Sequence, residues 1–200
     1  ALSERLGFNV VDVDGYAGYA ELPGTSDAQI GIIGHVDVVP EGSGWTYPPF
    51  AVTIKDGYLI GRGVLDDKGP VVACLYALKY WKDQGRELPY TIRFIFGCNE
   101  ETDLLDVEYY RKKHADPAFL FTPDAEFPLG YGEKGGYNGV LASKRIEGGC
   151  IREFSGGDAT NAVPGVAYAL IEADAADLPE KERLTIAKAG EGLVRIDAQG

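Results

Sequence analysis

Three apolar runs alternate along this chain with segments of helical spacing, and the alternation restricts the fold more than any other feature of the sequence. The runs lie within residues 28–39, 90–101 and 118–128, and each is short and continuous, as in the covered central strands of a sheet. Residues 69–85 and 103–117, which lie between the runs, have the periodicity of helices. Strands that alternate with helices predict an α/β fold with a largely parallel central sheet flanked by helices.

Two Asp-Gly pairs predict tight turns between further strands. Residues 8–22 indicate two short strands that turn at Asp14, and residues 50–63 indicate a hairpin that turns at Asp56. In both cases the aspartate is followed by glycine, which suits the backbone of such turns.

The character of the chain changes after Gly132. Glycine-rich, weakly periodic segments follow, and residues 165–187 predict a less apolar strand followed by a helix. We therefore place a boundary near residues 133–137, with one domain over residues 1–135 and the beginning of a second over residues 136–200.

Composition excludes several kinds of partner. The chain has 200 residues, a net charge of −12 and 45% apolar side chains, which suits a globular protein but not a partner with an anionic backbone or membrane surface. No apolar run approaches the roughly 20 residues of a membrane span. The three cysteines form no C-x-x-C pair, which indicates free thiols in a reducing compartment, so we expect a cytoplasmic protein.

One of the two histidines and several carboxylates follow the ends of the predicted strands. In open α/β sheets ligands bind outside the carboxyl ends of the strands, so these side chains are expected to meet at one edge. A further acidic pair lies between the hairpin and the first long helix. Without cations so many negative charges would repel one another strongly, and we therefore predict a metal site. The side chains concerned are His35, Asp37, Asp66, Asp67, Glu100, Glu101 and Asp124.

The spacing of these residues indicates a division of roles. His35 and Asp37 point to the same face of a strand, so His35 can bind a metal while Asp37 holds the imidazole in one tautomer. Glu100 and Glu101 are neighbours at a strand end, where one can ligate while the other takes a proton from water. Asp66 follows a flexible turn and can bridge two ions. Imidazole with carboxylates fits Zn²⁺, and Mn²⁺ or Co²⁺ would be tolerated.

Each of these residues also has an ordinary structural interpretation. A lone histidine in an apolar run is more often a hydrogen-bonded core residue, and an acidic residue after proline is common in turns. Asp66 and Asp67 would serve as helix caps, and Glu100 and Glu101 would begin the next helix. His114 would face the carboxyl end of its own helix. The coincidence of four such features at strand ends favours the metal site.

Other classes of function have less support. A calcium-binding domain would draw on carboxylates alone and leave His35 without a role. A serine hydrolase would need a G-x-S-x-G motif, and the G-R-G turn at residues 61–63 lacks the third glycine of a nucleotide-binding loop. A non-catalytic metal-binding module would use the same ligands and would not need Glu100 to stay free.

Four motifs carry a resemblance to a known family. They are GHVDVVPEGSGW (residues 34–45), GRGVLDDKGP (61–70), CNEET (98–102) and TPDAEFP (122–128). In this order they resemble the dinuclear zinc metallopeptidases that include aminoacylase, carnosinase and succinyl-diaminopimelate desuccinylase. The last two motifs are most similar to the PepV-type bacterial dipeptidases. The resemblance implies an incomplete zinc-peptidase catalytic domain, followed by the start of an α+β lid domain.

The family pattern implies a reaction and a role for each matching residue. A water activated by two zinc ions would hydrolyse short peptides, with N-acyl amino acids as the alternative substrates. Asp66 would be shared by the two ions, His35 and Asp124 would complete the first and Glu101 would bind the second. The implied roles outside the metal ligands are general base for Glu100, orientation of His35 for Asp37, and substrate binding in the lid for Asn161.

One departure from the family pattern affects the second zinc ion. The family supplies a histidine to that ion from far down the chain, and here no histidine follows His114. We therefore expect this chain to be the N-terminal part of a longer enzyme that is active as a whole, and to be inactive by itself.

Overall fold

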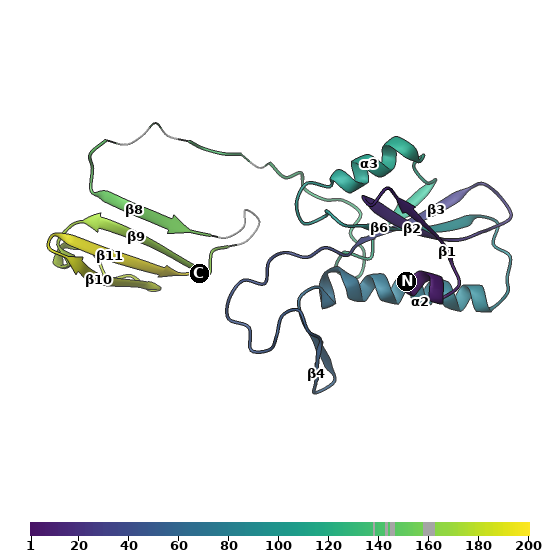
Figure 1. The fold of residues 1–200 in the computed structure, drawn as a ribbon, viewed down its shortest axis with the longest axis horizontal. Helices are drawn as coiled ribbons and strands as arrows, with labels where there is room; N and C mark the ends of the chain where they lie inside the picture. Colours follow the sequence, from purple (N-terminus) through teal and green to yellow (C-terminus); the bar gives the residue numbers. More distant parts are fainter. Residues whose placement is uncertain (138, 143, 145–146, 158–162) are drawn as a thin grey trace. The chain divides into compact units, whose positions relative to one another are not determined.

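The computed structural model describes residues 1–137, 139–142, 144, 147–157 and 163–200. These residues form two compact units (Figure 1). The first unit consists of residues 1–41 and 46–133, and the second consists of residues 42–45 and 134–200.

A five-stranded mixed sheet forms the centre of the first unit. Its order is β1 (Asn9–Val13), β2 (Ala17–Leu22), β6 (Thr91–Gly97), β3 (Gln29–His35) and β7 (Phe119–Phe121). The three strands predicted from the apolar runs, β6, β3 and β7, are parallel neighbours, whereas β1 and β2 extend the sheet in antiparallel pairing. The predicted α/β fold with a parallel centre is therefore confirmed.

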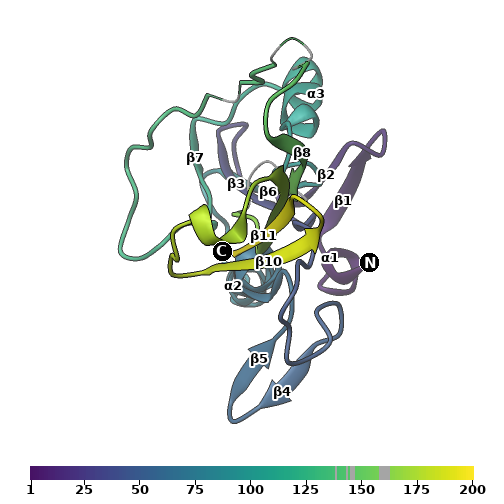
Figure 2. The same ribbon diagram turned by 90° about the vertical axis from the view of Figure 1, so that its left-hand side faces the viewer.

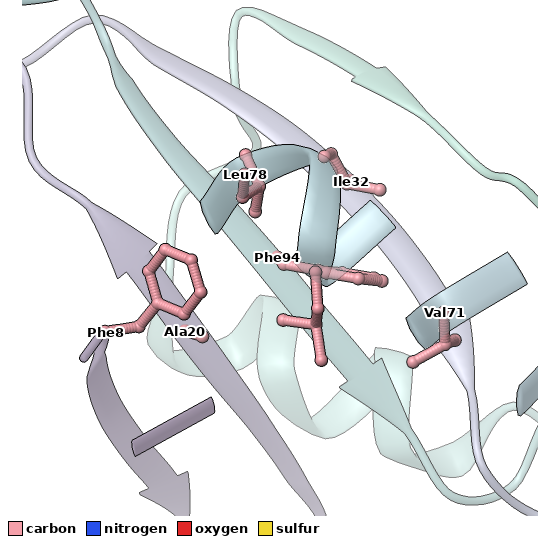
Figure 3. Packing of buried hydrophobic residues seen from close by; sticks show 7 residues of the cluster. Phe8, Ala20, Ile32, Val71, Leu78 and Phe94 are labelled. Carbon is pink, nitrogen blue, oxygen red and sulfur yellow. The ribbon is translucent and has the colours of Figure 1, made fainter. Parts of the chain in front are cut away.

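Two long helices cover opposite faces of this sheet. The helix α2 (Gly69–Asp83) packs through Val71, Leu75 and Leu78 on the face that also carries Phe94 (Figure 3). The helix α3 (Leu105–Lys113) packs against the other face, where Tyr110 lies among residues that include Ile95. Because Phe94 and Ile95 are adjacent in β6, their side chains point to opposite faces. A short helix, α1 (Leu2–Arg5), precedes β1.

Both predicted Asp-Gly turns are present. The strands β4 (Thr53–Lys55) and β5 (Tyr58–Ile60) pair antiparallel and extend away from the central sheet (Figure 2). At their turn the φ angles of Asp56 and Gly57 are 51° and 83°, a left-handed backbone that glycine and aspartate adopt more readily than other residues. The turn between β1 and β2 has the same signs of φ at Asp14 and its glycine.

The second unit is an antiparallel sheet. Its order is β10 (Leu184–Gly190), β11 (Leu193–Gln199), β9 (Val166–Glu172) and β8 (Ile151–Gly156). The helix predicted after β9 is wrong. A three-residue 3₁₀ turn (Ala175–Asp177) stands near the start of that segment and β10 near its end.

The physical reason is that this segment pairs with the strand that follows it in the chain. Pro179 cannot continue a helix, and Thr185 and Ile186 suit a pleated strand. The partner of this strand is β11, which follows it in the chain, and Ile186 lies opposite Ile196.

Among the described residues, no helix is long and apolar enough to cross a membrane.

Candidate metal centre

The carboxyl ends of β3, β6 and β7 bring the predicted site residues to one edge of the first unit. His35 is the last residue of β3 and lies beside Gly97, the last residue of β6. Asp124 follows β7, and Asp66 lies in an irregular helical turn, Val64–Lys68, that leads into α2. One ligand atom from each of His35, Asp66 and Asp124 lies within 4.8 Å of the other two.

The imidazole of His35 is buried and stands between carboxylates on both sides. Its Nε2 atom lies 2.8 Å from Oδ1 of Asp66, 3.4 Å from Oδ2 of Asp124 and 4.0 Å from Oε2 of Glu100. Its Nδ1 atom lies 3.2 Å from Oδ1 and 3.1 Å from the carbonyl oxygen of Asp37. Asp37 is therefore placed to accept a hydrogen bond from Nδ1.

This arrangement fits a cation next to Nε2. When Nδ1 donates to Asp37, a neutral imidazole turns its Nε2 lone pair toward the oxygens of Asp66 and Asp124, which also carry lone pairs. Either a second proton or a metal ion has to offset that repulsion. One imidazole and two carboxylates are a donor set that zinc and similar divalent cations accept. The residues present therefore fit a divalent metal.

The pKa values report the same concentration of negative charge. Burial alone would lower the pKa of His35, but its bond to Asp66 and the charges of Asp124, Asp37 and Glu100 outweigh burial and raise that pKa. Burial raises the pKa of Glu100 and of Asp124, and neighbouring carboxylates add to both shifts. The same carboxylates would hold a cation well, because a positive charge among them favours their ionised forms.

The two adjacent glutamates have different neighbours. Glu100 reaches toward Nε2 of His35, whereas the backbone N–H of Glu101 donates to Oδ2 of Asp37 at 3.1 Å. The Oε1 atom of Glu101 accepts from the backbone N–H of Val39 at 3.2 Å. Glu101 thus lies at the edge of the site but outside the group of three ligand atoms that meet at His35. Asn161, the predicted substrate-binding residue, lies outside the described residues.

The side chains of Asp66 and Asp67 also lie in different environments. Asp66 is exposed and faces His35, whereas Asp67 is fully buried and its Oδ2 atom accepts from the backbone N–H of His35 at 3.2 Å. Burial raises the pKa of Asp67 to about 6. The helix cap considered for this pair is not formed, because α2 begins after Lys68 without a side-chain cap.

Two buried carboxylates, Asp67 and Asp106, make contacts that the sequence pattern does not predict. The acidic pattern includes Asp67 but does not predict its bond to the backbone of His35. The sequence pattern assigns no role to Asp106, which is 2% exposed and accepts from three backbone N–H groups, two of them after β6 and one in α3. The available signal was its spacing, because Asp106 and Tyr110 occupy one turn of the same buried helix face.

The comparison with known families decides the relationship. The model of Peptidase family M20/M25/M40 matches residues 31–144. The chain belongs to this family. The matched segment contains every candidate site residue except Asn161, and it confirms the family that the four sequence motifs indicated.

Individual relatives are similar over most of this chain. "Putative dipeptidase YtjP" of Bacillus subtilis is 41% identical over an alignment of 176 residues that covers 86% of this chain and 38% of that protein. "Beta-Ala-Xaa dipeptidase" of Lactobacillus delbrueckii subsp. lactis is 38% identical over an alignment of 175 residues that covers 86% of this chain and 37% of that protein. The chain therefore spans less than half the length of these relatives.

Solved structures of the family share the fold. Human carnosine dipeptidase 1 aligns with a TM-score of 0.54 at 29% identity, over 62% of this chain and 30% of that one. The M20 family metallo-carboxypeptidase Sso-CP2 from Sulfolobus solfataricus aligns with a TM-score of 0.52 at 27% identity, again over 62% and 30%.

Proposed function

We propose that the protein to which this chain belongs is a metal-dependent dipeptidase that hydrolyses short peptides. The observation that carries the proposal is the meeting of His35, Asp66 and Asp124, with the carboxylate of Glu100 beside them. Membership of a peptidase family and the names of the relatives support a peptide as substrate.

The metal ligands follow from the donor set. His35, Asp66 and Asp124 would hold one ion, and Asp66 and Glu101 would contribute to a second. We propose zinc for both positions, with Mn²⁺ or Co²⁺ as substitutes, since imidazole and carboxylate ligands suit these ions. When bound, such a metal pair would polarise the scissile carbonyl group and lower the pKa of the attacking water.

The residues around the metal position supply the proton transfers. Glu100 would take a proton from the water as its oxygen attacks the carbonyl carbon. When the C–N bond breaks, Glu100 would return that proton to the leaving amine. The raised pKa of Glu100 suits this exchange, because a base whose pKa lies closer to neutrality also serves as an acid. Asp37 would keep Nδ1 of His35 protonated and so leave Nε2 free to bind the metal.

The organisation of the chain is part of the proposal. We assign residues 1–135 to the catalytic domain and residues 136–200 to the start of a lid domain, with Asn161 helping to hold the substrate. A cytoplasmic location is also proposed, on the strength of three cysteines without a paired motif.

Substrate assays with the full-length protein test this function. Purified protein loaded with Zn²⁺ is given unblocked dipeptides and, in parallel, N-acyl amino acids that lack a free amino group. Turnover of dipeptides that chelators abolish and Zn²⁺ restores is the expected result. Exclusive turnover of the acylated substrates would instead make the protein an amidohydrolase, and turnover of neither class would contradict a hydrolytic role.

A further inference from the structure

Asp106 is a buried carboxylate in α3 that bonds to the end of a neighbouring strand. Its Oδ2 atom accepts from the backbone N–H groups of Cys98 at 2.5 Å and Asn99 at 3.0 Å, and its Oδ1 atom accepts from Val107 at 2.7 Å. Burial of a carboxylate is unfavourable unless several donors face it, and three backbone N–H groups meet that need. Two of the three donors belong to the segment that follows β6 rather than to the helix itself.

Gly97 gives this carboxylate room to approach. A Cβ atom at Gly97 would lie 2.8 Å from Oδ2 of Asp106, closer than real Cβ contacts, and the next nearest atom outside Asp106 would be the carbonyl oxygen of Gly34 at 3.7 Å. The absence of a side chain at this position therefore matters for one contact, that with Asp106.

The neighbouring strand ends in the same way. A Cβ atom at Gly34 would lie 2.6 Å from Oδ2 of Asp67, and that oxygen accepts from the N–H of the next residue, His35. Gly34 and Gly97 thus each precede a residue whose N–H is bonded by a buried aspartate from the helical segment that follows the strand. At β3 the residue held in this way is the candidate metal ligand itself.

At the end of β6 the corresponding hydrogen bonds fix the backbone on both sides of Glu100. Asp106 holds the backbone just before it, at Cys98 and Asn99, and Asp37 holds the backbone just after it through the N–H of Glu101. The side chain of Glu100 therefore projects from a short turn that is fixed at both ends, with its carboxylate 4.0 Å from Nε2 of His35.

We propose that Asp106 is a positioning residue that holds the Cys98–Glu101 turn so that Glu100 meets the attacking water. The inference rests on the proposed function of Glu100 as general base. Asp106 would act through the backbone of Cys98 and Asn99, whose N–H groups donate to its Oδ2 atom.

The first experiment replaces Asp106 in the full-length, Zn²⁺-loaded protein. Asp106→Asn keeps the shape of the side chain but replaces one accepting oxygen with an amide group that cannot accept an N–H bond. We expect kcat to fall roughly 10- to 100-fold, as for a catalytic group displaced by about 1 Å, while KM changes less than about threefold and zinc content stays the same.

Two control variants separate positioning from stability. Glu108→Gln makes the same change on the exposed face of α3 and should leave kcat unchanged. Tyr110→Phe removes the bond between the Tyr110 hydroxyl and Arg93 in the same helix, so it lowers stability without touching the turn. If Tyr110→Phe lowers kcat as much as Asp106→Asn at a temperature where both are folded, Asp106 is merely structural and the proposal is overturned.

Double variants test the route of the effect. Gly97→Ala should lower kcat about as much as Asp106→Asn, and its effect should disappear in an Asp106→Ala background, where no carboxylate is left to displace. Asp106→Asn should cause little further loss in a Glu100→Gln background, because the base that it positions is already gone. Additive losses in both cycles would contradict the proposal.

Hydrogen exchange provides a measurement that does not depend on turnover. Asp106→Asn should accelerate exchange of the Cys98 and Asn99 amides more than exchange of the amides in β3, whereas Glu108→Gln should change neither. A wild-type protein that hydrolyses no dipeptide would defeat the proposed function, and this local acceleration would still show that Asp106 holds the turn. A uniform acceleration throughout the sheet would overturn the positioning role in either case.

Discussion

Asp66 and Asp67 are adjacent in the chain but lie in different environments, because Asp66 faces the imidazole of His35 while Asp67 is fully buried. The apolar runs predict which residues follow the strand ends, and His35, Asp66 and Asp124 do meet there. They do not predict which member of an acidic pair turns inward. Asp66 has φ of −119° and ψ of 101° inside an otherwise helical turn, and this local departure sends Asp67 into the interior. No spacing rule encodes such a departure.

The two glutamates provide the first prediction. In the full-length protein, Glu100→Gln should lower kcat by about 10²- to 10⁴-fold and leave metal content nearly unchanged, because a base is lost and a ligand is kept. Glu101→Gln should instead lower metal occupancy. Metal analysis and steady-state kinetics on both variants check this. Equal metal loss in the two variants would show that the roles are not divided as proposed.

His114 provides a prediction about stability and pH. Its ring stacks on Tyr110 at 4.7 Å, and burial, Arg93 and Lys113 lower its pKa while Glu21 opposes the shift. The unfolded chain binds this proton near pH 6.5, whereas the folded chain binds it only at lower pH. The free energy of unfolding should therefore fall as the pH drops below about 6.5 and level off below the folded pKa.

His114→Phe is the matching variant, because it keeps an aromatic ring against Tyr110 and removes the titration. Urea unfolding of both proteins at pH 7 and pH 5 should show a smaller loss of stability for the variant. The carboxylates contribute to both proteins alike, so the difference isolates His114. An identical pH dependence would mean that this ring has the same pKa folded and unfolded.

At the scale of elements, the periodicity of single segments predicted most of the first unit. The helices α2 and α3, both Asp-Gly turns and the three parallel strands lie where periodicity placed them. The failure at β10 came from a segment whose structure depends on pairing with β11. The junctions after β3 and β6 were equally hidden, since the need for glycine there becomes visible only when a buried aspartate from another element is seen to approach it.

Gly34 tests this junction. Gly34→Ala would place a Cβ atom 2.6 Å from Oδ2 of Asp67 and 2.7 Å from Cγ2 of Val71, so the start of α2 has to shift. We expect a loss of about 1–3 kcal/mol in the free energy of unfolding and weaker Zn²⁺ binding at His35. Gly18→Ala in β2 is the control, because its nearest contact would be an ordinary 3.5 Å. Similar losses in both variants would mean that strand glycines are simply intolerant of alanine.

At the scale of the whole molecule, the first unit has an open edge. The strand β7 lies at the end of the sheet order and pairs with β3, and its residues Phe119, Leu120 and Phe121 are 60%, 46% and 41% exposed. Three neighbouring exposed apolar side chains on an edge strand are unusual for a surface that faces solvent. The relatives, which are more than twice as long, have further chain available to cover such an edge.

The same comparison leads to a prediction for this chain taken alone. In the proposed site the first metal position would have three protein ligands, His35, Asp66 and Asp124, the number that a catalytic zinc site normally uses. The second would have only Asp66 and Glu101, since no histidine follows His114 in the sequence. Two carboxylates that lack an imidazole partner bind zinc weakly, and Asp66 is already engaged by the first ion. Calorimetric titration should therefore show at most one tightly bound Zn²⁺ per chain, and dipeptide hydrolysis should stay at background. Two tight ions or clear turnover would mean that a partner chain supplies the missing ligand, or that the second position is built from other residues.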